Sequence, residues 1–173
     1  MTASYKANAK KSNFTLALLE GTGWYKPDYT VAESLIWGNN RGCNFIDDYC
    51  IDQTTQKTNF VEFCDGLSQK TCTLDRRYKA SCSIQPYSGS PAYITWNYFG
   101  NGALSIDEFS DNCPYPIPLS NGDCYYSGTE SAKYDEAFGV DARCFEGTLV
   151  KSSFLPESSM NSFCFKYQVS KAI

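Results

Sequence analysis

The nine cysteines are the residues of this sequence whose type and spacing point most clearly to chemistry. The closest two, Cys43 and Cys50, are 7 positions apart, so no Cys-x-x-Cys pair is present for a structural zinc site. Single cysteines spread through a tyrosine- and serine-rich chain are typical of a disulfide framework in an oxidising compartment, the alternative being buried reduced thiols. Because their number is odd, one thiol is free or has its partner outside this sequence. The nine are Cys43, Cys50, Cys64, Cys72, Cys82, Cys113, Cys124, Cys144 and Cys164.

Histidine is absent from all 173 residues. This absence excludes from the chain a Ser-His-Asp triad, a Cys-His pair, an HExxH zinc helix and every imidazole proton shuttle. We therefore expect no His-ligated catalytic zinc within this sequence.

Acidic residues gather at Asp47-Asp48 and at Asp107, Glu108 and Asp111. Such groups could bind calcium or act in general acid–base chemistry, but the EF-hand spacing D-x-[DN]-x-[DN]-G is missing. Solvated loop carboxylates are the better interpretation.

One N-x-[ST] acceptor for N-glycosylation is present, at Asn13-Phe14-Thr15, whereas Asn161-Ser162-Phe163 fails at its third position. In a secretory context Asn13 is a glycan candidate; otherwise it is a plain helix-start asparagine. The tyrosine-rich runs could form a ligand platform, but buried cross-strand aromatics explain them better.

Length and composition indicate one globular domain, or one domain with the end of another. Apolar residues make up 42%, charged residues 20% and aromatic residues 16%, the last of these favouring a β-rich interior. With a net charge of −4 and no basic run, a nucleic-acid partner is not expected. Neither a signal-peptide apolar region nor an 18-residue apolar stretch is present. Since a disulfide-rich chain needs a route into the secretory pathway, the expectation is that an N-terminal part is missing.

The local patterns predict two helices near the N-terminus. Ser12 can cap a first helix through Glu20, with Phe14 and Leu18 on one face and Gly21 at its end. The sequence Thr30-Val31-Ala32-Glu33 reads as a capping box that starts a second helix, through Trp37 to a stop at 38–40. Beyond a soft boundary near residue 42, helical periodicity fades.

From Cys43 onward, short apolar runs alternate with turn signals, which predicts antiparallel strands and loops. The predicted strands include 93–96 and 124–126, and the predicted turns include 88–91, 101–102 and 121–122. Proline at positions 114, 116 and 118 predicts an extended segment, either polyproline II or an edge strand.

The order of the motifs is specific. A first group comprises Gly23-Trp24-Tyr25, Asp28-Tyr29, Ala32-Glu33 and Trp37-Gly38-x-Asn40-x-Gly42-Cys43. A second comprises Cys50, Phe63-Cys64, Cys72, Cys82, Tyr93, Tyr98-Phe99, Cys113-Pro114-x-x-x-Pro118-x-Ser120-x-Gly122-x-Cys124 and Asp141-Ala142-Arg143-Cys144. Together, from residue 1 to about 168, they resemble the leishmanolysin (M8) zinc metallopeptidase family.

In that family, zinc is held by two histidines of an HExxH helix and by a third histidine, and the glutamate of the motif is the general base. A Met-turn then lies under the metal. Counted back from Trp24, the resemblance places this turn at Met1, so residues 1–4 would lie beside the S1′ pocket of a complete enzyme.

The resemblance also implies a disulfide map. It leaves Cys43 unpaired here, because its family counterpart bonds a cysteine upstream of the Met-turn. A further family cysteine would stand near Val169, and its absence suggests truncation at that end too. The implied pairs are Cys50–Cys113, Cys64–Cys82, Cys72–Cys144 and Cys124–Cys164.

The resemblance therefore implies the C-terminal portion of a leishmanolysin-like zinc metalloendopeptidase, at the cell surface or outside the cell. Because the HExxH motif and the third histidine of the family are absent, we expect no catalytic residue and no metal ligand in this chain, and no activity of the chain alone. Its expected partners are the missing N-terminal catalytic half, which would bond Cys43, and protein substrates of the complete enzyme. The expected fold is α+β, with residues 1–42 ending the catalytic region and 43–173 forming a disulfide-stapled, mainly antiparallel domain. The alternative is a stand-alone, non-catalytic binding or adhesion module on the same scaffold.

Overall fold

The computed structural model describes residues 9–88, 98–99, 102–105, 110–126, 136–147 and 162–168. Within them, short helices near the N-terminus are followed by three small antiparallel sheets, which confirms the α+β prediction. The predicted strand 93–96 and most of the predicted turns at 88–91 and 101–102 lie outside the described residues.

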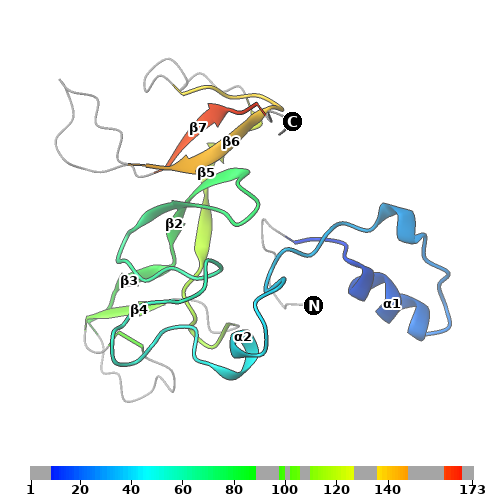
Figure 1. Ribbon diagram of the computed structural model, residues 1–173, viewed down its shortest axis with the longest axis horizontal. Coiled ribbons are helices and arrows are strands. Elements are labelled where there is room, and N and C mark those ends of the chain that lie inside the picture. The colour runs from blue at the N-terminus through cyan, green and yellow to red at the C-terminus, as the bar shows by residue number, and fades with distance from the viewer. Residues whose placement is uncertain are drawn as a thin grey trace, which may run out of the picture.

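The first predicted helix is confirmed as α1, Asn13–Gly21. Ser12 is its N-cap in extended conformation, although its side chain makes no capping hydrogen bond. Phe14 and Leu18 are exposed, and Leu16 is the helix residue that is buried. Figure 1 shows α1 on the right, well apart from the strands.

The second predicted helix is wrong. Only a 3-10 turn, η1, forms at Tyr29–Val31, and the chain is extended after it. Asp28 caps this turn, because its carboxylate accepts from both the backbone N–H (2.9 Å) and the hydroxyl (2.6 Å) of Thr30, which lowers the Asp28 pKa. The Thr30 hydroxyl is thus engaged elsewhere, and so is Glu33, which exchanges hydrogen bonds with the backbone of Lys11.

The largest sheet has the strand order β1-β2-β5, from Lys70–Cys72, Tyr78–Cys82 and Pro116–Asp123. The predicted extended proline segment is thus an edge strand in its second half. Pro116 and Pro118 pair with Cys82 and Ala80. Cys82 N–H donates to Gln69 on the opposite side, so these proline positions are the non-hydrogen-bonded ones, where a missing donor costs nothing.

The turn predicted at Asn121-Gly122 is wrong, because both residues belong to β5. The glycine signal instead marks an irregularity, since the register of β5 against β2 shifts between Tyr78 and Ala80. A Cβ on Gly122 would lie 2.5 Å from the carbonyl oxygen of Lys79, so only glycine permits this approach.

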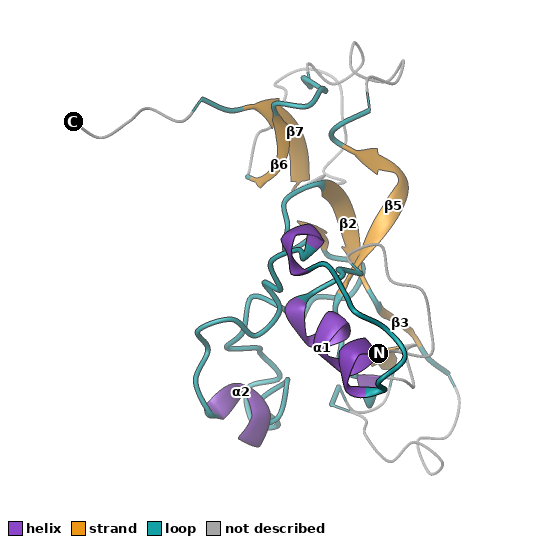
Figure 2. Ribbon diagram, turned by 90° about the vertical axis from the view of Figure 1, so that its right-hand side faces the viewer, coloured by secondary structure: helices purple, strands orange, loops and turns teal. Residues whose placement is uncertain are grey.

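Two smaller sheets are also present in the described ranges. In one, β3 (Ile84–Pro86) pairs with β4 (Ala103–Ser105); in the other, β6 (Ala142–Glu146) pairs with β7 (Ser162–Lys166). A short helix, α2 (Asn44–Asp47), precedes the sheets. Both views place β6 and β7 together at one end of the molecule (Figures 1 and 2). The strand predicted at 124–126 is instead a turn that follows β5.

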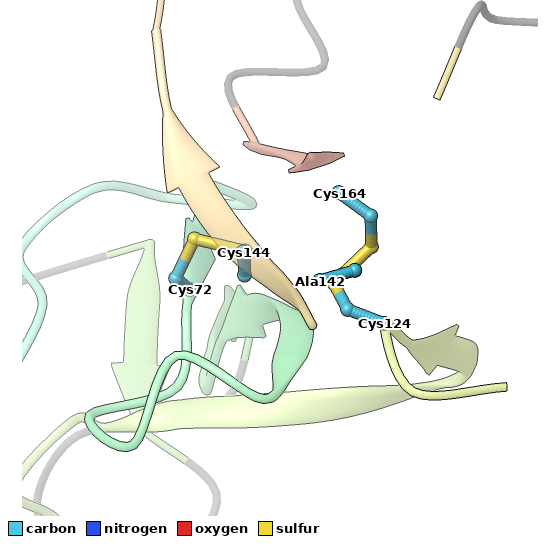
Figure 3. Packing of buried hydrophobic residues seen from close by; sticks show 5 residues of the cluster. All are labelled: Cys72, Cys124, Ala142, Cys144 and Cys164. Carbon is cyan, nitrogen blue, oxygen red and sulfur yellow. A yellow bond between two sulfur atoms is a disulfide. The ribbon is translucent and has the colours of Figure 1, made fainter. Parts of the chain in front are cut away.

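Each buried apolar cluster contains cysteine. The cluster between the largest sheet and β6–β7 consists of four cysteines and Ala142 (Figure 3). Phe138 packs against it. A second gathers around Ile51 with Cys50, and a third around Ile84 with Cys64 and Cys82. Disulfide sulfur therefore takes much of the place that aliphatic side chains have in a larger core.

Acid is expected to weaken the contact between β6 and β1 through Glu146. Burial disfavours its charged form, but hydrogen bonds from the Thr71 hydroxyl and Cys72 N–H, together with Arg76, outweigh burial and lower its pKa below 4.5. The lowered folded-state pKa means that this stabilisation is complete above the pKa of the unfolded chain and is lost as the pH falls through the folded-state value. Denaturant titrations from pH 7 to pH 3 should therefore show a smaller acid loss in Glu146→Gln than in the wild type. Equal losses would contradict this role.

Candidate functional site

The predicted site residues lie in different parts of the molecule. Met1 is outside the described residues. Asn13 is exposed at the first position of α1, and Cys43 is exposed and free at the N-cap of α2. The structure joins the other cysteines as Cys50–Cys113, Cys64–Cys82, Cys72–Cys144 and Cys124–Cys164, with Cα–Cα distances of 5.4–5.9 Å.

The zinc site that the family resemblance implies does not fit the residues of this chain. The sequence has no histidine, and among the described residues no group of three or more Cys, Asp or Glu side chains could hold a metal ion. Asp47, Asp48 and Asp111 are exposed, while Asp107 and Glu108 lie outside the described ranges. We therefore derive no metal-dependent step from this chain.

The turn before Cys43 has an unusual backbone, which explains the residue types of its motif. Gly38, Asn40 and Gly42 have φ angles of 68°, 60° and 76°. This left-handed region is readily adopted by glycine and is tolerated by asparagine. Cys43 then starts α2, so the turn determines where the Cys43 thiol lies on the surface.

A buried carboxylate holds this turn. The side chain of Glu62 is fully buried, and its Oε1 accepts from Arg41 Nε (2.9 Å) and from the backbone N–H of Gly38 (3.3 Å). Its other oxygen, Oε2, has no partner among the residues that the structure describes. Gly38 and Arg41 of the turn are thus both tied to the segment that carries Glu62.

Four aromatic rings pack under the turn. Phe45 stacks on Phe63 at 5.8 Å between ring centroids and meets Phe60 edge-on at 5.2 Å. Trp37 lies edge-on to Phe63 at 5.5 Å. The cluster fixes α2, and therefore Cys43, against the disulfide-linked body.

Gly38→Ala is expected to destabilise the protein by about 2 kcal/mol or more, because a left-handed backbone and a steric clash both oppose the new methyl. The Cβ would lie 2.7 Å from the ring of Phe45, which the other rings hold in place. Gly42→Ala is the matched control, with a similar φ angle of 76° and no atom within 4 Å of its Cβ. Urea unfolding measures both variants; equal losses would show that the Phe45 contact is unimportant.

The N-terminal arm, residues 9–42, exposes much apolar surface. Ser12 and Leu16 are its only buried residues. Phe14 is 77% exposed and Trp24 is 85% exposed. Large exposed apolar surfaces of this kind mark sites that another surface covers. The other large exposed residues of the arm are Leu18, Leu19, Tyr25, Tyr29, Val31, Leu35 and Trp37.

One tyrosine-rich run forms a stack with arginines rather than a buried cross-strand pair. Tyr125 lies between Arg77 (4.8 Å to the ring centroid) and Arg143 (4.7 Å), and Arg143 also lies over Tyr167 (4.9 Å). Arg77 additionally forms a two-pronged ion pair with Asp123. Sequence reasoning missed this stack, as it missed Glu62, because the partners are far apart in the chain.

Comparison with known proteins finds similarity to one family, leishmanolysin. The family model for leishmanolysin matches residues 1–173. The chain is 31% identical to leishmanolysin of Leishmania tropica over 137 residues, covering 77% of this chain and 21% of the relative. It is 30% identical to a leishmanolysin-like peptidase of Caenorhabditis briggsae over 182 residues, covering 84% of this chain and 27% of the relative.

The chain thus spans about a quarter of the length of these relatives or less. Within the part of the chain that is described, no helix is long and apolar enough to cross a membrane. The motif order and the family match over residues 1–173 agree, and the chain belongs to the leishmanolysin (M8) family of metallopeptidases.

Proposed function

We propose that this chain is the disulfide-rich C-terminal portion of a leishmanolysin-type zinc metalloendopeptidase. In this proposal the zinc ligands and the general base belong to polypeptide outside this sequence. The chain contributes the Met-turn, part of the floor of the substrate cleft and a stable scaffold. The complete enzyme would hydrolyse peptide bonds of protein substrates.

The exposed apolar surface of the N-terminal arm is the observation that carries the proposal. A nine-residue helix with one buried apolar side chain gains too little from burial to hold its place alone. We infer that the zinc-bearing half covers the arm and also supplies the cysteine that bonds Cys43. Such a covalent link would lie next to the turn that the buried carboxylate of Glu62 fixes.

The proposal is tested by translating the DNA upstream of the Met1 codon. An in-frame HExxH followed by a further histidine supports it, and proteolysis by the complete protein should then be abolished by a metal chelator. The isolated chain should neither retain zinc after dialysis nor hydrolyse casein. Stoichiometric zinc together with chelator-sensitive proteolysis by the isolated chain would overturn the proposal.

The isolated chain is expected to form disulfide-linked dimers through Cys43 under oxidising conditions, because this exposed thiol lacks its partner. Cys43→Ser should remain monomeric with its four internal bridges, and serine suits the N-cap position that Cys43 occupies. Free thiols of the monomer fraction are blocked with a labelled reagent, and the unreduced protein is digested. Recovery of the label on any other cysteine would contradict the assignment of Cys43 as the unpaired one.

The second candidate is a non-catalytic binding or adhesion module. The Arg143–Tyr125 stack favours it, since Tyr125 is exposed and the half-buried Arg143 has no carboxylate partner among the described residues. A signal peptide spliced directly onto Met1 would support this candidate and contradict the first. Both candidates place the protein at the cell surface or outside the cell, where Asn13 could carry a glycan that glycosidase treatment would remove.

A further inference from the structure

Four cysteines share one buried cluster, so something must select how they pair. Cys72, Cys124, Cys144 and Cys164 all belong to it (Figure 3), and four cysteines allow three different pairings. The structure contains Cys72–Cys144 and Cys124–Cys164, each of which joins strand β6 or β7 to the largest sheet or to the turn that follows it.

The competing bond is one between the cross-strand neighbours Cys144 and Cys164. Cys144 and Cys164 are direct partners in the register of β6 and β7. The N–H of Cys144 donates to Arg76 and the N–H of Cys164 to Glu136, so neither points across to the other strand. They therefore form a non-hydrogen-bonded pair, the kind whose side chains approach each other most closely. Proximity alone would favour Cys144–Cys164.

A short segment, Glu136–Gly139, contacts both halves of the native Cys124–Cys164 bond. The carboxylate of Glu136 accepts from Cys164 N–H (2.9 Å), and Ala137 N–H donates to the Cys164 carbonyl (2.9 Å). Two residues later, Gly139 N–H donates to the Cys124 carbonyl (2.9 Å). The backbones of the two cysteines are thus held on one segment of four residues.

A buried ion pair anchors this segment to the largest sheet. Lys79 Nζ lies 2.9 Å and 3.1 Å from the two carboxylate oxygens of Glu136, and the side chains are 3% and 0% exposed. A buried pair of this kind commonly adds no more stability than apolar side chains of the same size, whereas it requires one particular geometry. Lys79 also lies beside Gly122, two residues before Cys124, so it borders the same turn.

We propose that the segment Glu136–Gly139, anchored by Lys79, is a pairing guide that directs Cys164 to Cys124 instead of to its cross-strand neighbour Cys144. Each bond forms by thiol–disulfide exchange with an oxidised small disulfide such as glutathione disulfide. One protein thiolate attacks it and releases one glutathione thiolate; the second protein thiolate attacks the mixed disulfide and releases the other. Two protein thiols are oxidised, and the glutathione disulfide is reduced to two thiols.

The test is oxidative refolding of the full chain in the Cys43→Ser background, which removes the odd thiol. Reduced protein is refolded in a glutathione buffer, free thiols are blocked at intervals, and the bonds are mapped after digestion with trypsin and Asp-N protease. Cleavage before Asp111 and Asp123 separates Cys124 from Cys82 and Cys113, which trypsin leaves on one peptide. Cleavage after Arg143 and Lys151 places Cys144 and Cys164 on different peptides. We expect the ratio of Cys124–Cys164 to Cys144–Cys164 to fall about fivefold or more in Lys79→Met/Glu136→Met, which loses the acceptor for Cys164 N–H.

Gly139→Ala tests the other end of the guide without touching the ion pair. Its φ angle of 142° strains any other residue, so the hydrogen bond to Cys124 should be displaced and the ratio should again fall. Gly102→Ala, with a φ angle of 109° and no described atom within 4 Å of its Cβ, carries comparable strain in the turn before β4 and should leave the ratio unchanged. An unchanged ratio in both guide variants, or an equal fall in Gly102→Ala, would overturn the proposal.

Discussion

Lys79→Met is expected to lower the free energy of unfolding by about 3–5 kcal/mol, the cost of leaving a buried charge without its partner. The Glu136 carboxylate would remain at 0% exposure, and among the described residues the Cys164 N–H alone would still donate to its oxygens. The loss is a large part of the roughly 5–15 kcal/mol by which a domain is stable. Urea unfolding with the disulfides intact measures it.

Two comparisons make this expectation specific to the buried pair. Lys166→Met removes an ion pair whose side chains are 59% and 52% exposed, and it should change stability by less than about 1 kcal/mol. Lys79→Met/Glu136→Met should recover most of the loss, because apolar side chains can fill the same space. Losses of similar size in Lys79→Met and Lys166→Met would contradict the assigned burial.

Removal of the Cys72–Cys144 bond is the second large effect expected. The bond closes a loop of 72 residues, and in the chain-entropy description its loss costs about 4 kcal/mol. Cys64–Cys82 spans 18 residues, so its loss should cost about 1 kcal/mol less by the same relation. Alanine pairs at each bond, compared by urea unfolding, measure the difference.

The cluster around Cys72 and Cys144 adds to this cost, because its buried members other than Ala142 are all cysteines. Full reduction should therefore abolish the sharp unfolding transition of the strands, whereas a chain with a large aliphatic core would retain it. A cooperative transition in the reduced protein, close to that of the oxidised one, would contradict a disulfide-dependent core.

Local patterns predicted the elements that depend on neighbours in sequence. The first helix was predicted where it lies, between Ser12 and Gly21, although its expected apolar face of Phe14 and Leu18 is exposed. The prolines predicted an extended segment, polyproline II or an edge strand, and the structure has the edge strand from Pro116. The second helix failed because Thr30 donates to Asp28 and Glu33 bonds Lys11, a contact between residues 22 positions apart. The residue types of a capping box do not predict a helix when other residues take the hydrogen bonds of their side chains.

The buried charged contacts and the register shift could not be predicted from neighbouring residues in the sequence. Lys79 and Glu136 are 57 positions apart, and a charged residue in a strand is ordinarily expected to face solvent. Glu62 reaches back 24 positions to Gly38. Gly122 was predicted to lie in a turn. The structure requires a glycine there for another reason, because the register of β5 shifts and brings this residue against Lys79 in another strand.

The most direct test is to identify what Cys43 is bonded to in the protein isolated from its natural source. The unreduced protein is digested with trypsin and chymotrypsin; cleavage after Tyr49 separates Cys43 from Cys50, so the peptide joined to Cys43 alone can be sequenced. We expect a partner peptide that is absent from these 173 residues and belongs to a polypeptide with an HExxH motif. A Cys43 that is free in the natural protein, or bonded to another cysteine of this chain, would contradict it.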